Sequence, residues 1–194
     1  MATVYNSPIN SSYTANNKND IFNQLQNKIA TFSATDKILI GGDFNARTAT
    51  IPDFMNEDTD DLKYQQFPNG YDLSVSKERN NRDKIKNEYG KYLTELCSTT
   101  NLRILNGRTL GDLYGEFTYC GKLGLSTVDY ILASVNMTKD KHIQYMKVQP
   151  ITFLSDHRPL LLKLNHKIKH SNNTSEIITL QNMPEKYAIK DITI

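Results

Sequence analysis

The sequence predicts a single globular domain of the α/β (α+β) class, and three observations support the domain count, the globular character and the class in turn. A length of 194 residues suits one domain with a sizeable hydrophobic core. Hydrophobic residues make up 38% and charged residues 23% of the chain, with both signs mixed, which is typical of a soluble globular protein. Stretches with helical spacing of apolar residues alternate with short apolar runs, and this alternation is the pattern of α+β or layered α/β domains.

The N-terminal part of the chain is expected to form a strand, a helix and a second strand. The chain opens on TVYNSP, at residues 3–8, which is typical of a strand that runs into a loop. Residues 20–32 place apolar side chains at helical spacing, namely Ile21, Leu25, Ile29 and Phe32. The run KILIGG, at 37–42, is rich in isoleucine and ends in two glycines, so it predicts a buried strand.

The middle of the chain is expected to form a long loop and then a second helix. Residues 51–82 are polar, acidic at first and interrupted by Pro52, Pro68 and Gly70, so we expect little regular structure there. Such a loop is either functional or mobile, or it is a solvated acidic surface. Residues 87–99 then carry a second helical stripe, made of Tyr89, Tyr92, Leu93, Leu96 and Cys97.

The C-terminal part is expected to be mostly β. Strand-like runs follow the second helix at residues 102–106, 116–120, 128–134, 147–152 and 159–165. The periodicity fades after Lys167. We therefore expect one domain over residues 1–166 and a tail over residues 167–194.

Composition and charge exclude several classes of protein. The formal net charge of +2 is too small to indicate a nucleic-acid-binding surface by itself, so any basic surface must be local. No run is long and apolar enough to span a bilayer, and the N-terminus lacks the apolar core of a signal peptide. The two cysteines, Cys97 and Cys120, do not make a disulfide framework, and we expect Cys97 to be a buried, reduced thiol. An intracellular location without a membrane segment is expected, and a nuclear one fits this expectation.

The first polar group follows the strand expected at 37–42. If the chain stays extended there, Asp43 and Asn45 project to one side and Phe44 packs on the other as an anchor. A carboxylate beside an amide suits the orientation of a water or the binding of a hard cation, because both offer oxygen ligands. The alternative is a strand-ending turn, in which Gly, Asp and Asn are the commonest residues.

The second polar group is Asp129, inside the strand-like run STVDYILAS. Alternation places Val128, Tyr130 and Leu132 on one face, and Asp129 on the other. Aspartate is depleted in strands and is costly to bury unless it is paired. Either its face is exposed at this end of the strand, or the carboxylate has a function.

The third polar group is LSDHRPLLL, in which Asp156 and His157 come just before a further apolar strand. Pro159 favours extended backbone at Arg158. Neighbours in an ideal strand point opposite ways, so Asp156 and His157 reach one pocket only from a bend. Histidine is the usual side chain for proton transfer or phosphate contact near neutral pH, whereas a polar surface turn is the alternative.

Together, the three polar groups predict one convergent site at the ends of core strands. If Asp129 meets His157, its carboxylate accepts a hydrogen bond from the imidazole N–H. This contact fixes the tautomer of the ring and favours its cationic form.

The motifs GGDFN, STVDYIL and LSDHRPL, in this order, resemble the endonuclease/exonuclease/phosphatase superfamily, the fold of DNase I and the abasic-site endonucleases. The stretches GDFNART, NEYGKYLTELC, LRILNGR and GEFTYCGKLGLSTVDYIL are most similar to the endonuclease domains of non-LTR retrotransposons. The resemblance covers roughly residues 3–165. It implies a partial four-layer α/β sandwich, with the site at one end of two packed sheets.

The resemblance also implies roles for the residues of the three polar groups. Asp43 would align and deprotonate the attacking water, and Asn45 would orient water and phosphate. His157 would contact the scissile phosphate as an imidazolium held by Asp129. Asp156 would be a carboxylate on the metal side of the site.

The resemblance assigns two further residues, a cofactor and a partner. Tyr5, in VYNSP, occupies the place of a tyrosine near the phosphate, and Thr118 matches a substrate-binding position. The implied cofactor is Mg²⁺, with Mn²⁺ as an alternative. The implied partner is DNA or another nucleic acid.

The chain departs from the family pattern at its start. The family places an asparagine and a metal-binding glutamate upstream of the tyrosine motif, and no acid precedes Asp20 here. The first third of the fold is therefore expected to be missing. The resemblance favours a Mg²⁺-dependent endonuclease of mobile-element origin. The alternatives are a phosphomonoesterase acting on an inositol phosphate or a lipid head group, and a non-catalytic remnant or nucleic-acid-binding module.

Overall fold

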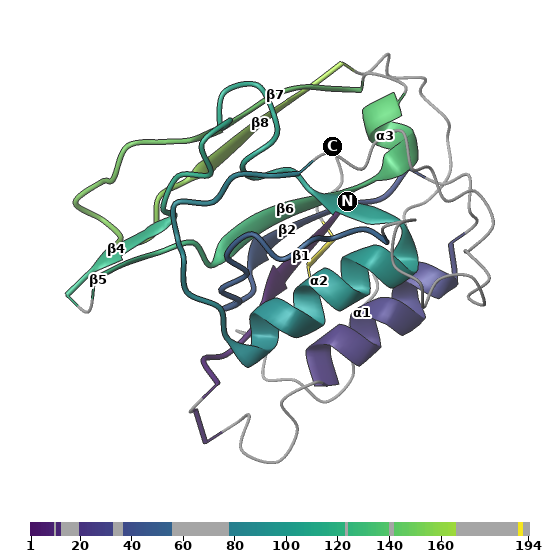
Figure 1. The fold of residues 1–194 in the computed structure, drawn as a ribbon, viewed down its shortest axis with the longest axis horizontal. Helices are drawn as coiled ribbons and strands as arrows, with labels where there is room; N and C mark the ends of the chain where they lie inside the picture. Colours follow the sequence, from purple (N-terminus) through teal and green to yellow (C-terminus); the bar gives the residue numbers. More distant parts are fainter. Residues whose placement is uncertain are drawn as a thin grey trace.

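The protein is built in three layers, two helices, a central sheet and a two-stranded sheet (Figure 1). This computed structural model describes residues 1–9, 11–12, 20–32, 37–55, 78–122, 124–139, 142–165 and 190–191. One hydrophobic core lies between the helices and the central sheet. A second core lies between the central sheet and the two-stranded sheet.

The central sheet has the strand order β3-β6-β2-β1-β9. Its strands are β1 (Ala2–Tyr5), β2 (Leu39–Asp43), β3 (Leu102–Ile104), β6 (Asp129–Ser134) and β9 (Lys190–Asp191). β1 runs parallel to β2, and the other neighbouring pairs are antiparallel. β2 therefore lies in the middle of the sheet, hydrogen-bonded on both edges.

The register of β2 against β6 decides which side chains share a face. Leu39 lies opposite Ala133 and Asp43 lies opposite Asp129, so these residues face the second core or its edge. Ile40, opposite Leu132, faces the helices. The expected alternation along the run 128–134 is confirmed.

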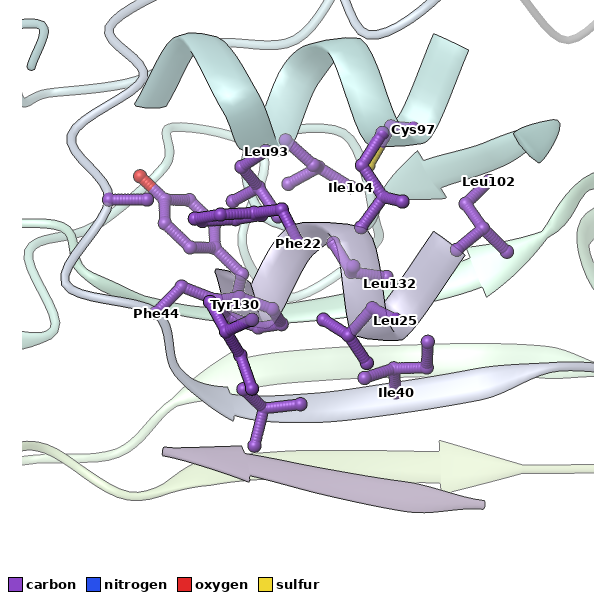
Figure 2. Close-up of a cluster of buried hydrophobic side chains, with 14 of the residues drawn as sticks. Phe22, Leu25, Ile40, Phe44, Leu93, Cys97, Leu102, Ile104, Tyr130 and Leu132 are labelled. Atoms are coloured by element: carbon purple, nitrogen blue, oxygen red, sulfur yellow. The ribbon is translucent and has the colours of Figure 1, made fainter. Parts of the chain in front are cut away.

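Two helices cover one face of the central sheet, α1 (Asp20–Ala30) and α2 (Glu88–Thr100). In Figure 2, Leu25 of α1 lies next to Ile40 and Leu132 of the sheet. Cys97 of α2 is completely buried and has no disulfide, as expected, and burial raises the pKa of its thiol.

The second core is closed by the strands β7 (Ile143–Val148) and β8 (Leu160–Leu164). Met146 and Val148 of β7 are buried against Ile131 and Ala133 of β6. The remaining elements are the short hairpin strands β4 (Tyr119–Gly121) and β5 (Gly124–Ser126) and the helix α3 (Val135–Lys139). No helix among the described residues has the length and apolar character needed to cross a membrane.

The structure corrects the bounds of two expected strands. The strand expected at 147–152 runs over 143–148 instead, because Pro150 has no N–H for a sheet ladder and the chain turns back at Thr152–Ser155. The strand expected at 116–120 begins at Tyr119. β5, α3 and β9 were not predicted, and β9 lies within the segment expected to be a tail. Most of the loop expected at 51–82 lies outside the described residues.

A buried ionic network ties residues 51–53 to the rest of the fold. The Asp53 side chain is completely buried and accepts hydrogen bonds from Ile104 N at 2.7 Å and Arg108 Nη2 at 2.6 Å. Arg103 and Arg79 are also buried, and they contact the carbonyls of Asp53 and Ile51. One carboxylate thus lies among three guanidinium groups, of which those of Arg79 and Arg103 belong to buried residues and that of Arg108 to a partly buried one.

We predict that Asp53→Asn lowers the free energy of unfolding by about 3–5 kcal/mol, because it leaves buried positive charge without a counter-ion. The measurement is urea unfolding followed by circular dichroism. Glu116→Gln is the control, because it breaks the more exposed pair with Arg82 and should cost less than about 1 kcal/mol. Equal effects of the two substitutions would contradict the prediction.

Candidate active site

The candidate site begins with two aspartates that lie opposite each other where two neighbouring inner strands of the central sheet end. Asp43 ends β2, Asp129 begins β6, and the two are Cα partners in the antiparallel ladder. Gly42 allows the close approach of β1, because its φ is +148° and an added Cβ would lie 1.9 Å from the carbonyl oxygen of Val4. Cross-strand neighbours share a face, so the two carboxylates meet at the open end of the sheet.

The chain turns directly after Asp43, which differs from the extended path that we expected. Asn45 has a left-handed φ of +48°, and its N–H donates to Asp43 Oδ1 at 2.9 Å. Its Nδ2 donates to Asp43 Oδ2 at 3.3 Å and to the carbonyl of Asn6 at 2.7 Å. The turn that we considered as the alternative therefore occurs, and it brings the Asn45 amide onto the Asp43 carboxylate.

Phe44 anchors this turn in the core between the helices and the sheet. It has no exposed surface, and its ring centroid lies 6.4 Å from that of Tyr130. Its carbonyl accepts a hydrogen bond from Asn6 Nδ2 at 3.0 Å. The predicted anchoring role of Phe44 is confirmed.

His157 reaches the site from the segment before β8. Its Nδ1 lies 3.0 Å and 3.1 Å from the two carboxylate oxygens of Asp129. The ring packs edge-on against Tyr119, with centroids 5.1 Å apart. Because a carboxylate accepts hydrogen bonds, Nδ1 carries the proton and the Nε2 side of the ring is left for other contacts.

Thr118 supports Asp129 from inside the protein. It is completely buried, and its Oγ1 accepts the N–H groups of Val128 and Asp129 at 3.0 Å each. A side chain without exposed surface does not reach a substrate in this structure. In this structure Thr118 supports Asp129 from behind, and the substrate contact expected of Thr118 stays a prediction.

Burial raises the pKa of both aspartates. Burial, followed by the negative charge of Asp129, raises the pKa of Asp43 to about 6. Burial also raises the pKa of Asp129, although the hydrogen bonds from Thr118 and His157 act in the opposite direction. Asp43 is thus close to the range in which a carboxylate exchanges protons at neutral pH.

For His157, burial and the neighbouring carboxylates shift the pKa in opposite directions. Burial alone would lower the pKa of its imidazole, but the charge and the hydrogen bond of Asp129 outweigh burial and raise it. The charges of Asp43 and Asp156 act in the same direction. The site therefore favours a cationic imidazole.

Two carboxylates of the site could hold a metal ion, and the imidazole beside them could join only in its neutral form. One ligand atom from each of Asp43, Asp129 and His157 lies within 4.8 Å of the others. Two half-buried carboxylates with raised pKa values fit a divalent cation, since it would supply the positive charge that they lack. Asp156, the carboxylate expected on the metal side, is exposed and lies outside this group of three.

Tyr5 lies beside the aspartate pair in the central sheet. It ends β1 and is the parallel Cα partner of Asp43. Its side chain is 37% exposed. The structure thus brings Tyr5, Asp43, Asn45, Asp129 and His157 to one edge of the sheet.

Our reasoning from the sequence missed two asparagines of the site. Asn6 holds both Phe44 and Asn45, as described above. Asn106 is buried, donates to the Asp129 carbonyl at 3.1 Å and accepts the Ile131 N–H at 3.1 Å. Asn6 and Asn106 each lie one or two residues after the end of a strand, as Asn45 does. An asparagine directly after an apolar run is therefore the sequence pattern that could have identified them.

Comparisons with known proteins identify the family and the fold of the chain. A family profile described as endonuclease-reverse transcriptase matches residues 1–161. Among solved structures, the chain is similar to the 3′ phosphatase NExo from Neisseria bound to product DNA hairpin, with a TM-score of 0.52 and 14% sequence identity. The match covers 84% of this chain and 60% of that chain, and at this identity it shows the fold alone. No sequence among the curated proteins matches. These findings confirm the predicted fold class and the resemblance.

We predict that Asp43→Asn stabilises the protein at neutral pH. The pKa of Asp43 is higher in the folded state than its ordinary value of 3.8, so ionisation penalises folding once the pH rises from about 4 to above 6. The neutral amide avoids this penalty, and the free energy of unfolding should rise by about 1–3 kcal/mol at about pH 8. Urea unfolding across this pH range measures the effect.

The control is Asp83→Asn, for which the opposite sign is expected. Burial alone would raise the pKa of Asp83, but hydrogen bonds from Arg47 and from backbone N–H groups outweigh burial and lower it. Its contribution to stability is present above its ordinary pKa and lost as the pH falls, so its amide variant is destabilised at neutral pH. A stability difference for Asp43→Asn that does not change with pH would contradict the prediction.

Proposed function

Because the chain belongs to the endonuclease-reverse transcriptase family of the endonuclease/exonuclease/phosphatase superfamily, we propose that it hydrolyses phosphodiester bonds of nucleic acid as a Mg²⁺-dependent endonuclease. The observation that carries the proposal is the imidazole–carboxylate pair of His157 and Asp129 beside a second half-buried carboxylate, Asp43. Phosphodiester hydrolysis needs a base for the attacking water and positive charge at the phosphate. This edge of the sheet offers both.

Asp43 is the proposed base. Its pKa of about 6 leaves it ionised at neutral pH, but basic enough to accept a proton from a water molecule. Asn45 holds both carboxylate oxygens of Asp43, so the direction of their remaining lone pairs is fixed. We therefore assign to Asn45 the orientation of the carboxylate, and of the water that it binds.

His157 is the proposed phosphate contact. Asp129 holds Nδ1, which leaves Nε2–H of the imidazolium to donate to a phosphoryl oxygen. Thr118 fixes the backbone of Asp129, and Tyr119 packs against the ring. The direction of the ring is therefore determined before a substrate binds.

Metal binding and the phosphate-side residues complete the proposal. Asp43 and Asp129 are the carboxylates that would hold Mg²⁺, with Mn²⁺ as an alternative, and Asp156 is a further candidate. When bound, the ion would stabilise negative charge on the phosphoryl oxygens. Tyr5, which lies beside Asp43, is proposed to contact the phosphate.

A phosphomonoesterase is the second candidate function. One structural neighbour is a 3′ phosphatase bound to product DNA hairpin, which supports removal of a terminal phosphate as an alternative reaction for the same residues. An inositol phosphate or a lipid head group is a further substrate class for such an activity.

A retrotransposon origin of the chain is part of the leading proposal and has no bearing on the chemistry.

We predict that the wild-type chain nicks supercoiled plasmid DNA in the presence of Mg²⁺, and that Asp43→Ala and His157→Ala each lower the rate by at least about 100-fold. The rate is measured from the conversion of supercoiled to open-circular DNA. His142→Gln is the control, because this second described histidine contacts Lys37 and Asn165 away from the site. It should cleave at the wild-type rate.

The outcome that would overturn the assignment is nicking that survives in both Asp43→Ala and His157→Ala. The same protein is assayed on a panel of a 3′-phosphorylated oligonucleotide, an inositol phosphate and a phosphoinositide. Release of phosphate from one of these without nicking would favour the phosphomonoesterase.

A further inference from the structure

The first turn of α2 packs directly against the backbone that follows Asp43. Gly90 allows this contact, because an added Cβ would lie 2.0 Å from the carbonyl oxygen of Arg47. Asn87, the N-cap residue of α2, is extended and lies beside residues 45–47. A helix end is thus fixed to the turn that carries Asn45.

Asn87 makes more hydrogen bonds than a helix cap requires. Its Oδ1 accepts the N–H of Gly90 at 2.8 Å, which is the capping bond, and also the N–H of Arg47 at 2.9 Å. Its Nδ2 donates to the carbonyl of Asn45 at 2.9 Å, and its backbone N–H donates to the carbonyl of Arg47 at 3.0 Å. Only the bond from Nδ2 reaches Asn45 itself.

Asn45 needs such support because of its backbone conformation. Its φ of +48° lies in the left-handed region, where a residue with a side chain is normally sparse, although Asn tolerates it better than most. Asp43 Oδ1 holds the N–H of Asn45 on one side, and Asn87 Nδ2 holds its carbonyl on the other. The two peptide groups that flank Asn45 are therefore fixed from opposite directions.

We infer that Asn87 is a positioning residue for the reaction, acting through its Nδ2–H on the Asn45 carbonyl, and this inference rests on the function proposed above. By locking the backbone of Asn45, Asn87 sets the direction in which the Asn45 N–H and amide hold the Asp43 carboxylate. Any good N-cap side chain would serve the helix. Only a side chain that also donates a hydrogen bond would serve the turn.

The two roles are separated by Asn87→Asp. The carboxylate keeps both acceptor bonds and adds a negative charge at a helix N-terminus, which is favourable. It cannot donate to the Asn45 carbonyl and repels it instead. We expect kcat for Mg²⁺-dependent cleavage to fall by about 10-fold or more, with a smaller change in KM, because sub-ångström misplacement of a catalytic group has effects of this size. The melting temperature should stay within about 3 °C of the wild type.

Two matched variants distinguish the lost hydrogen bond from the added charge. Glu88→Gln changes the charge of the neighbouring residue, whose side chain accepts a hydrogen bond from Tyr92, and should leave kcat unchanged. The double variant Asn87→Asp with Glu88→Gln has the wild-type net charge and should remain slow. If the double variant recovers wild-type kcat, the charge rather than the hydrogen bond causes the loss and the inference is overturned. Asn87→Ala, which loses the cap as well, should lose both kcat and thermal stability.

Amide hydrogen exchange gives a readout that does not depend on activity. In Asn87→Asp, the N–H of Asn45 should exchange about 10-fold faster than in the wild type, while the amides of α2 keep their protection. Unchanged exchange of Asn45 together with wild-type kcat would overturn the positioning role. If the wild-type protein cleaves no phosphate ester but the exchange of Asn45 responds as expected, the proposed function fails and the positioning of the turn by Asn87 stands.

Discussion

The pairing of β2 with β6 is the constraint on which the rest of the structure depends. This register places Asp43 opposite Asp129 and, on the same face, Leu39 opposite Ala133 in the second core. A slip of one residue would turn every side chain of one strand to the other face, so that Asp129 would point at the helices. Packing of the two cores and assembly of the site are therefore specified by the same ladder. Stability of the fold and correct placement of the carboxylates cannot be varied independently at this point.

The site places unfavourable groups at the end of that favourable ladder. Two carboxylates meet at a partly buried sheet edge, and the pKa of each is raised by burial. The surrounding polar groups are arranged to compensate, with Thr118 and His157 on Asp129 and Asn45 on Asp43. Such a concentration of like charge is more typical of functional sites than of ordinary strand ends, because it lowers the stability of the fold, and it agrees with the function that we propose.

The sequence was sufficient to predict those parts that depend on periodicity. The helices α1 and α2 and the alternation along β6 follow from the spacing of apolar residues, and the three polar groups at the strand ends were identified as one site. Other features depend on contacts that no local pattern encodes. The left-handed Asn45 is held by Asn6 and Asn87 from distant segments, and the Thr118 hydroxyl can be buried because it accepts the N–H groups of Val128 and Asp129. Pairing of Lys190–Asp191 with β1 is likewise a tertiary choice, made by two residues without a strand signal of their own.

In the motif SDHRP, Arg158 fixes the backbone next to His157. This contact explains how a histidine on an exposed segment keeps a fixed direction. Arg158 donates its N–H to the Thr118 carbonyl at 2.7 Å, and its guanidinium donates to the carbonyls of Gln149 and Phe117. These bonds tie the segment to the two chain segments that flank it, the end of β7 and the approach to β4. Because Arg158 is held on this side and Pro159 restricts its backbone, the preceding residue has little freedom to move away from Asp129. Arg158 thus has a structural role, and it holds in place the histidine to which we assign the phosphate contact. A search for charged residues near the site would assign the wrong role to Arg158 unless its carbonyl partners were examined.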